Sequence, residues 1–133
     1  MRRLMVVCGA AAALVLGAVP AAGGQVSGTT TLEGPATSGG AVVVAVTLRG
    51  VYPVVAYDYL LENRCWFKGR FTGPYDSAET YPLLGPWFAA PGGGSYSEEN
   101  VDLDIVPAGA VCKVTVNRGS TPVKGTTTSY SVG

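Results

Sequence analysis

Apolar and polar residues alternate along the second half of this chain, and this period of two constrains the fold more than any other feature. In the stretch 100–106, NVDLDIV, apolar residues occupy every second position and two aspartates lie between them. The stretch 107–119, PAGAVCKVTVNRG, continues the same alternation after a turn. Successive side chains of a β-strand point to opposite faces, so both stretches are predicted to be strands with one buried face. This pattern predicts that Ile105 points inward and that Asp102 and Asp104 point outward.

Further short runs of apolar and β-branched residues lie between glycine and proline turn signals. They predict strands at 29–33, 41–50, 54–67, 79–88 and 126–133. The run 79–88 contains Pro82 and Pro86, which favours an edge strand or a bend. No segment after the N-terminal leader shows a 3.6-residue apolar period over helical length. Seven short strands predict an all-β fold, a single antiparallel β-sandwich of the immunoglobulin-like or fibronectin III-like class.

The stretch 54–67 carries the clearest alternation in the first half of the chain. Asn63 interrupts the apolar side and Leu60 interrupts the polar side. The residues predicted to face the core occupy odd positions: Val55, Tyr57, Tyr59, Leu61 and Cys65.

The segment 105–116, IVPAGAVCKVTV, combines a strand end, a Pro-Ala-Gly turn and a long alternating strand. It is similar to the E–F corner of fibronectin-type and immunoglobulin-like sandwiches. This resemblance covers one corner of the fold and implies an architecture only. In such a sandwich the third and sixth strands are neighbours within one sheet, and these are the strands predicted to carry Cys65 and Cys112. The chain departs from a true immunoglobulin domain, because Trp66 directly follows the first cysteine.

The first residues show the three-part pattern of a secretory signal peptide. Arg2 and Arg3 precede an apolar run from Leu4 to Val19, and Val19 and Ala21 stand at the −3 and −1 spacing of a cleavage site. The run of about 16 apolar residues is shorter than the roughly 20 that span a bilayer. We therefore expect export with removal of this leader.

The expected organisation is a signal peptide at 1–22, a flexible linker at 23–28 and a β-sandwich domain at 29–133. Two of the nine basic residues belong to the leader, which leaves seven basic against nine acidic residues, a net charge of −2. Because no basic patch remains, nucleic acid is not an expected partner. No later stretch is long and apolar enough for stable membrane insertion.

Two cysteines lie outside the leader, whereas Cys8 belongs to its apolar run. An even pair in an exported protein predicts a disulfide between Cys65 and Cys112. The bond would close a ring of 48 residues, counting both ends. In the chain-entropy model such a ring stabilises the fold by about 4 kcal/mol. Two thiols without any histidine are too few ligands for a closed zinc site, and no cofactor is expected.

Carboxylates are the remaining route to catalysis, because a chain without histidine has no Ser-His-Asp or Cys-His arrangement. Asp102 and Asp104, with Glu98 and Glu99 just upstream, form the acidic cluster of the sequence. On one strand face the two aspartates could bind calcium or act as an acid–base pair. We expect a solvated strand face instead, because no aspartate-rich calcium loop surrounds them.

Aromatic residues concentrate in the middle of the chain, between positions 66 and 96. Secreted binding modules use exposed aromatic side chains to contact sugars or proteins, and the alternative is that these residues pack on the core. Parity predicts that Phe67 shares the buried face of Cys65 and that Trp66 points outward. The candidate binding surface consists of one charged and three aromatic residues: Trp66, Arg70, Tyr75 and Trp87.

These features predict a secreted or cell-surface, non-catalytic binding or interaction module with a protein or carbohydrate ligand. The alternative is a secreted inhibitor of a protease or glycosidase that presents a loop at 69–82 on a disulfide-braced scaffold. A third possibility is a small hydrolase that uses the carboxylates around Asp102. A binding module requires an exposed aromatic surface, an inhibitor requires a rigid protruding loop, and a hydrolase requires an acidic pocket.

Overall fold

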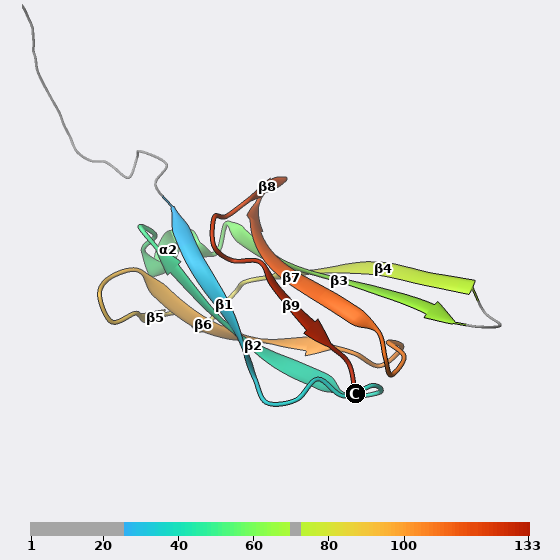
Figure 1. Cartoon of the computed structure of the whole chain (residues 1–133). Helices are drawn as coiled ribbons and strands as arrows, with labels where there is room; N and C mark the ends of the chain where they lie inside the picture. Colours follow the sequence, from blue (N-terminus) through green and yellow to red (C-terminus); the bar gives the residue numbers. More distant parts are fainter. Residues whose placement is uncertain (1–25, 70–72) are drawn as a thin grey trace, which may run out of the picture.

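Two antiparallel sheets make up the protein in a computed structural model that describes residues 26–69 and 73–133 (Figure 1). The first sheet has the order β1-β2-β6-β5, with β1 at Ser27–Glu33, β2 at Ala41–Arg49, β6 at Ser95–Asp102 and β5 at Phe88–Ala89. The second has the order β4-β3-β7-β8, with β4 at Gly73–Pro82, β3 at Tyr59–Gly69, β7 at Val111–Arg118 and β8 at Thr121–Pro122. The strand β9, Thr128–Ser131, also pairs with β7. This arrangement confirms the predicted all-β sandwich.

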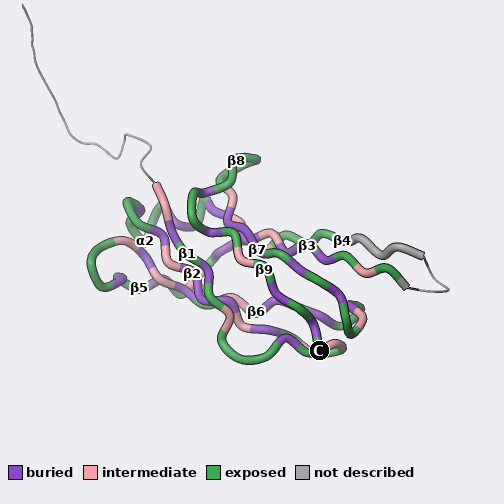
Figure 2. The backbone as a smooth tube through the Cα atoms, in the orientation of Figure 1, coloured by how far each residue is buried: buried purple, intermediate pink, exposed green. Residues whose placement is uncertain are grey.

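Side chains from both sheets form one hydrophobic core. Figure 2 shows buried residues interspersed with exposed and intermediate ones along the strands. On β2 the buried residues Val42, Val44, Val46 and Leu48 follow the period of two. On β7 the buried Cys112, Val114 and Val116 do the same, as predicted. Burial of each such aliphatic side chain stabilises the fold by about 1.5–3 kcal/mol.

The predicted strand at 54–67 is wrong over its first residues. The helix α2, Pro53–Ala56, precedes β3, and both Val55 and Tyr57 are exposed rather than buried. Pro53 stands in the first turn of this helix, where its fixed φ and missing N–H fit a helix start. The chain therefore turns at α2, and the alternation of apolar and polar residues forms a strand only from Tyr59 onward.

The strand that contains Asp102 begins and ends earlier than predicted. β6 runs from Ser95 to Asp102, and Ile105 is 72% exposed although parity placed it inside. The Asp102 carboxylate accepts a hydrogen bond of 2.9 Å from the N–H of Asp104. This local turn of the Asx type ends the strand, so the period of two no longer decides which side chains face the core.

The proline-containing stretch 79–88 splits into an edge strand and a bend. β4 ends at Pro82 on the edge of its sheet, and a cis peptide joins Gly85 to Pro86. A further difference concerns the start of the domain, since β1 begins at Ser27, within the expected linker. The predicted leader, 1–22, lies outside the described residues.

Candidate binding surfaces

Cys65 and Cys112 form the predicted disulfide. They are direct partners on β3 and β7, which confirms that the bond joins two neighbouring strands of one sheet. Their Cα atoms are 4.0 Å apart. This distance lies just below the usual range of about 4.4–6.8 Å for disulfides. Residues directly opposite each other on neighbouring antiparallel strands have Cα atoms about 4.5–5.5 Å apart, so the two cysteines are close enough for the bond.

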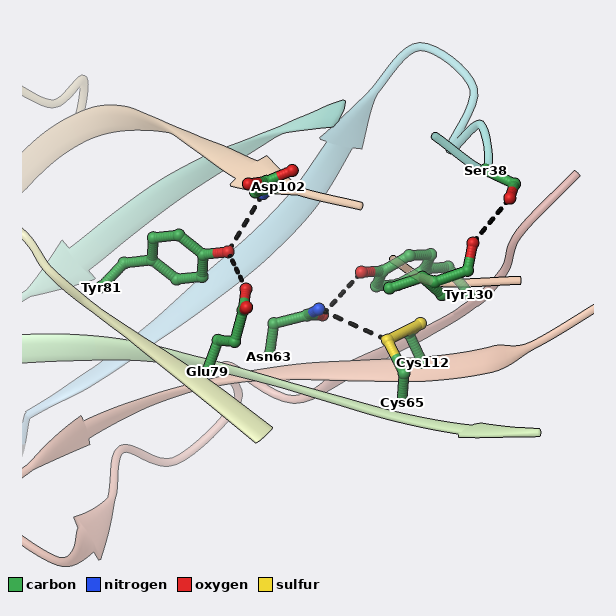
Figure 3. The surroundings of a disulfide bond; sticks show 9 residues. Ser38, Asn63, Cys65, Glu79, Tyr81, Asp102, Cys112 and Tyr130 are labelled. Carbon is green, nitrogen blue, oxygen red and sulfur yellow. Dashed lines mark hydrogen bonds between the residues drawn. A yellow bond between two sulfur atoms is a disulfide. The ribbon is translucent and has the colours of Figure 1, made fainter. Parts of the chain in front are cut away.

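A buried polar network surrounds the disulfide (Figure 3). Asn63 is 3% exposed and occupies a position on β3 where the alternation would place an apolar residue. Its side-chain nitrogen donates to the Cys65 sulfur at 3.4 Å, and its side-chain oxygen accepts a bond of 2.5 Å from the Tyr130 hydroxyl. Since both polar ends of the amide have partners, Asn63 is tolerated inside the core.

The buried phenol of Tyr130 is expected to make the protein less stable as the pH becomes alkaline. Burial raises the pKa of its phenol to about 12, and the hydrogen bond to Asn63 lowers it in part. The unfolded chain releases the same proton near pH 10, so the free energy of unfolding should fall as the pH rises from about 10 to 12. We expect Tyr130→Phe to make this fall less steep. Urea unfolding of both proteins between pH 9 and about 12 tests this prediction. An unchanged pH dependence in the variant would contradict it.

Trp66 lies on the outer face of the second sheet and is 38% exposed, as parity predicted. The Arg64 guanidinium carbon is 5.4 Å from the centre of the indole ring, and the Lys113 ammonium nitrogen is 5.7 Å from it. Val111, opposite Trp66 on β7, is also exposed. We call Arg64, Trp66, Val111 and Lys113 the sheet-face patch. Because two cations of the protein already contact the ring, less of its surface is open to a ligand.

The remaining candidate residues do not extend this patch. Trp87 is 9% exposed, and its indole N–H donates to the Leu83 carbonyl at 2.9 Å. The prediction of Trp87 as a surface residue is therefore wrong, since its side chain packs in the core. Arg70 lies outside the described residues, as does the side chain of Tyr75.

Phe67 is half-buried against the core on the Cys65 side of β3. The parity that separated it from Trp66 is confirmed. The expectation that Phe67 is mostly buried holds only in part, because its side chain is partly exposed.

A larger exposed apolar surface lies at one end of the sandwich. It holds six of the nine large apolar residues that are exposed in the described part of the chain. We call this set the loop-end surface: Tyr52, Val54, Val55, Tyr57, Leu84 and Phe88. Its residues come from two segments, one around α2 and one before and within β5, which Figure 1 shows at the same end of the molecule.

Two buried serines on β6 hold these segments together. The Ser95 hydroxyl donates to the Val51 carbonyl at 2.7 Å, and the Ser97 hydroxyl donates to the Pro86 carbonyl at 3.0 Å. An added Cβ on Gly85 would lie 3.3 Å from the Tyr57 ring, so the two segments also meet directly. Sequence reasoning missed this surface because it assigned residues 54–58 to a strand. The sequence did contain one signal of it. Ser95 and Ser97 are small polar residues at positions of β6 that face the core.

A pocket of about 430 Å³ adjoins the loop-end surface at Tyr52. Its walls come from the end of β2 and from the turn before β6: Arg49, Gly50, Val51, Tyr52 and the glycines 92–94. The turn needs glycine at position 94 for two reasons. Its φ is +99°, and an added Cβ would lie 2.1 Å from the Leu48 carbonyl oxygen.

The neighbouring Gly93 offers a matched comparison, since its φ is +98° but an added Cβ would meet nothing within 4 Å. We expect Gly93→Ala to cost about 1–2 kcal/mol, because the backbone conformation alone is unfavourable for alanine. Gly94→Ala should cost about 1–3 kcal/mol more, because the Cβ also displaces the end of β2. Denaturant unfolding of the two variants measures the difference. Equal stabilities would show that the turn does not approach β2 as described.

The acidic residues of the sequence cluster lie on β6 and in the turn that follows it. Asp104 lies in the turn after β6 and not on the strand, so the expected pairing of Asp102 and Asp104 on one strand face is wrong. No group of three or more metal-ligating side chains occurs within residues 26–69 and 73–133. A hydrogen bond with Glu98 raises the pKa of Glu33, and burial raises the pKa of Glu99. None of these carboxylates lines the pocket beside Tyr52.

Neither a scan against protein-family models nor a search of curated proteins finds a match to this sequence. In the part of the chain that the structure describes, no helix is both long and apolar enough to cross a membrane.

Proposed function

We propose that this protein is an exported, non-catalytic binding module and that it contacts its ligand through the loop-end surface. The observation that carries the proposal is the gathering of six exposed apolar side chains on two adjoining segments. Soluble proteins rarely leave a large contiguous apolar patch exposed unless it takes part in an interaction. The leader pattern and the disulfide both support export.

The way in which the surface is held supports this role. Val51 and Pro86 are fixed by hydrogen bonds from buried serines, and Tyr59 accepts a backbone bond of 3.1 Å from Leu83. A surface that is ordered before binding loses less conformational freedom when the ligand arrives. Tyr52, Tyr57 and Phe88 have rigid aromatic side chains of the kind that anchor protein interfaces.

An inhibitor of a protease or glycosidase is the second candidate, and the β3–β4 hairpin is the feature that favours it. In Figure 1 this hairpin extends beyond the body of the sandwich. The expected loop at 69–82 is largely the strand β4, whose pairing with β3 runs from Gly73 to Pro82. Because β4 lies at the edge of its sheet, it could add to an extended segment of a target enzyme.

Affinity capture with matched variants tests the proposal. The immobilised mature protein and a Tyr52→Ser, Tyr57→Ser, Phe88→Ser variant are compared for the partners that they retain from medium conditioned by the producing cells. We expect the triple variant to lose the partner, since it removes three aromatic anchors whose truncation costs about 2 kcal/mol or more each at interface centres. A Trp66→Ser variant is the control and should retain the partner. Retention by the triple variant together with loss by Trp66→Ser would contradict the proposal and assign binding to the sheet-face patch.

A further inference from the structure

Among the described residues that line the pocket beside Tyr52, there is one cation and no anion. The side chain of Arg49 is exposed and makes no ion pair or side-chain hydrogen bond with the described residues. A Cβ added to Gly92 would lie 3.6 Å from a terminal nitrogen of the guanidinium, so the Arg49 side chain lies against the glycine turn. The pocket therefore presents a planar set of donors that matches a carboxylate, which arginine binds through two parallel hydrogen bonds.

The glycine turn can add a main-chain donor. Gly93 donates to the Ala90 carbonyl at 3.0 Å, whereas the N–H of Gly92 bonds to no backbone carbonyl of the described residues. A turn without side chains also lets a ligand approach the backbone closely. Backbone N–H groups of turns are a common element of anion sites, and here the N–H of Gly92 is the candidate donor.

The rest of the lining favours an apolar ligand over a sugar. Within the described lining, Arg49 and the Tyr52 hydroxyl are the only polar side-chain groups. A bound sugar ring would bury several hydroxyl groups, and each would need a partner to avoid a loss of free energy. Tyr52 is 77% exposed and belongs to both the pocket and the loop-end surface, which continues the site with apolar side chains. The site therefore suits a ligand that carries one anionic group next to apolar groups. The C-terminal end of a polypeptide with apolar last residues has this chemistry.

We propose that this pocket binds the C-terminal carboxylate of a polypeptide partner through Arg49, with the last apolar side chains of the partner on the loop-end surface. This inference rests on the proposed function and adds the chemistry of the ligand. Capture of a C-terminal carboxylate by main-chain donors is an established mode of peptide recognition, and arginine binds carboxylates through two parallel hydrogen bonds.

Titration with a defined peptide tests the inference. Acetyl-Ala-Val-Leu with a free carboxylate is added at millimolar concentration to the isotope-labelled mature protein, and the amide resonances are followed by NMR. We expect the resonances of residues 92–94 and the side-chain N–H of Arg49 to shift. The same peptide with a C-terminal amide should bind at least about tenfold more weakly, because the hydrogen bonds to a charged group are lost.

Two variants that each remove one positive charge test whether Arg49 acts within the pocket or only through the overall charge of the protein. Arg49→Gln should weaken binding of the free acid by at least about tenfold and remove the difference between acid and amide. Lys124→Gln, at another exposed position, should bind the acid as the unchanged protein does. The inference is overturned if the amide binds as well as the acid, if the resonances of residues 92–94 do not shift, or if glucuronate shifts them at lower concentration than the peptide.

Failure here is distinguishable from failure of the proposed function. If Arg49→Gln retains the captured partner while the triple loop-end variant loses it, the binding surface stands and the carboxylate pocket does not.

Discussion

Replacing both Cys65 and Cys112 by alanine is expected to lower the free energy of unfolding by about 2–5 kcal/mol. The bond closes a ring of 48 residues, which restricts the unfolded chain. Its loss also leaves the buried side-chain nitrogen of Asn63 without its sulfur partner, which adds to the cost. Denaturant unfolding of the double variant measures the change.

Reduction of the unchanged protein provides the control for this experiment. The reduced protein should lose most of the same stability, since it lacks the same cross-link but keeps the Cys65 sulfur that accepts from Asn63. A change of about 0.5 kcal/mol or less would contradict the role given to the disulfide, because that is the size expected of an unimportant substitution.

Trp87→Ala is expected to destabilise the protein by about 3–5 kcal/mol, the cost of removing a buried aromatic side chain. The indole fills the end of the core, and its N–H satisfies the Leu83 carbonyl. Trp66→Ala is the matched comparison and should cost about 1 kcal/mol or less, since it removes an exposed ring and its two cation–π contacts. Denaturant unfolding of both variants decides between the two environments, and a reversal of this order would contradict the fold.

The sequence was sufficient to predict those parts of the fold that follow from local alternation. Period two on 107–119 predicted β7 and the inward position of Cys112, and the E–F corner resemblance predicted that β3 and β7 are neighbours. It failed where one hydrogen bond or one proline outweighed the alternation. Pro53 starts a helix in an apolar run, and the Asp102 carboxylate ends β6 before Ile105.

The candidate site was less predictable, because it depends on contacts between distant segments. Trp87 is buried in the core and bonds to the Leu83 carbonyl, and the segment before Phe88 is attached to β6 through the Ser97 hydroxyl. Likewise, the Ser95 hydroxyl reaches a carbonyl 44 positions earlier in the chain. The spacing of apolar residues along the sequence carries no information about contacts between distant segments. The loop-end surface could therefore be recognised only from the arrangement of the segments in the structure.

Hydroxyl-radical footprinting of the captured complex is the most direct test of the claim that the loop-end surface binds the partner. Oxidation of Tyr52, Tyr57 and Phe88, followed by mass spectrometry, should be strongly reduced in the complex relative to the free protein. Oxidation of Trp66 should stay the same in both. Protection of Trp66 with unchanged oxidation of Tyr52, Tyr57 and Phe88 would contradict this account and place the interface on the outer face of the second sheet.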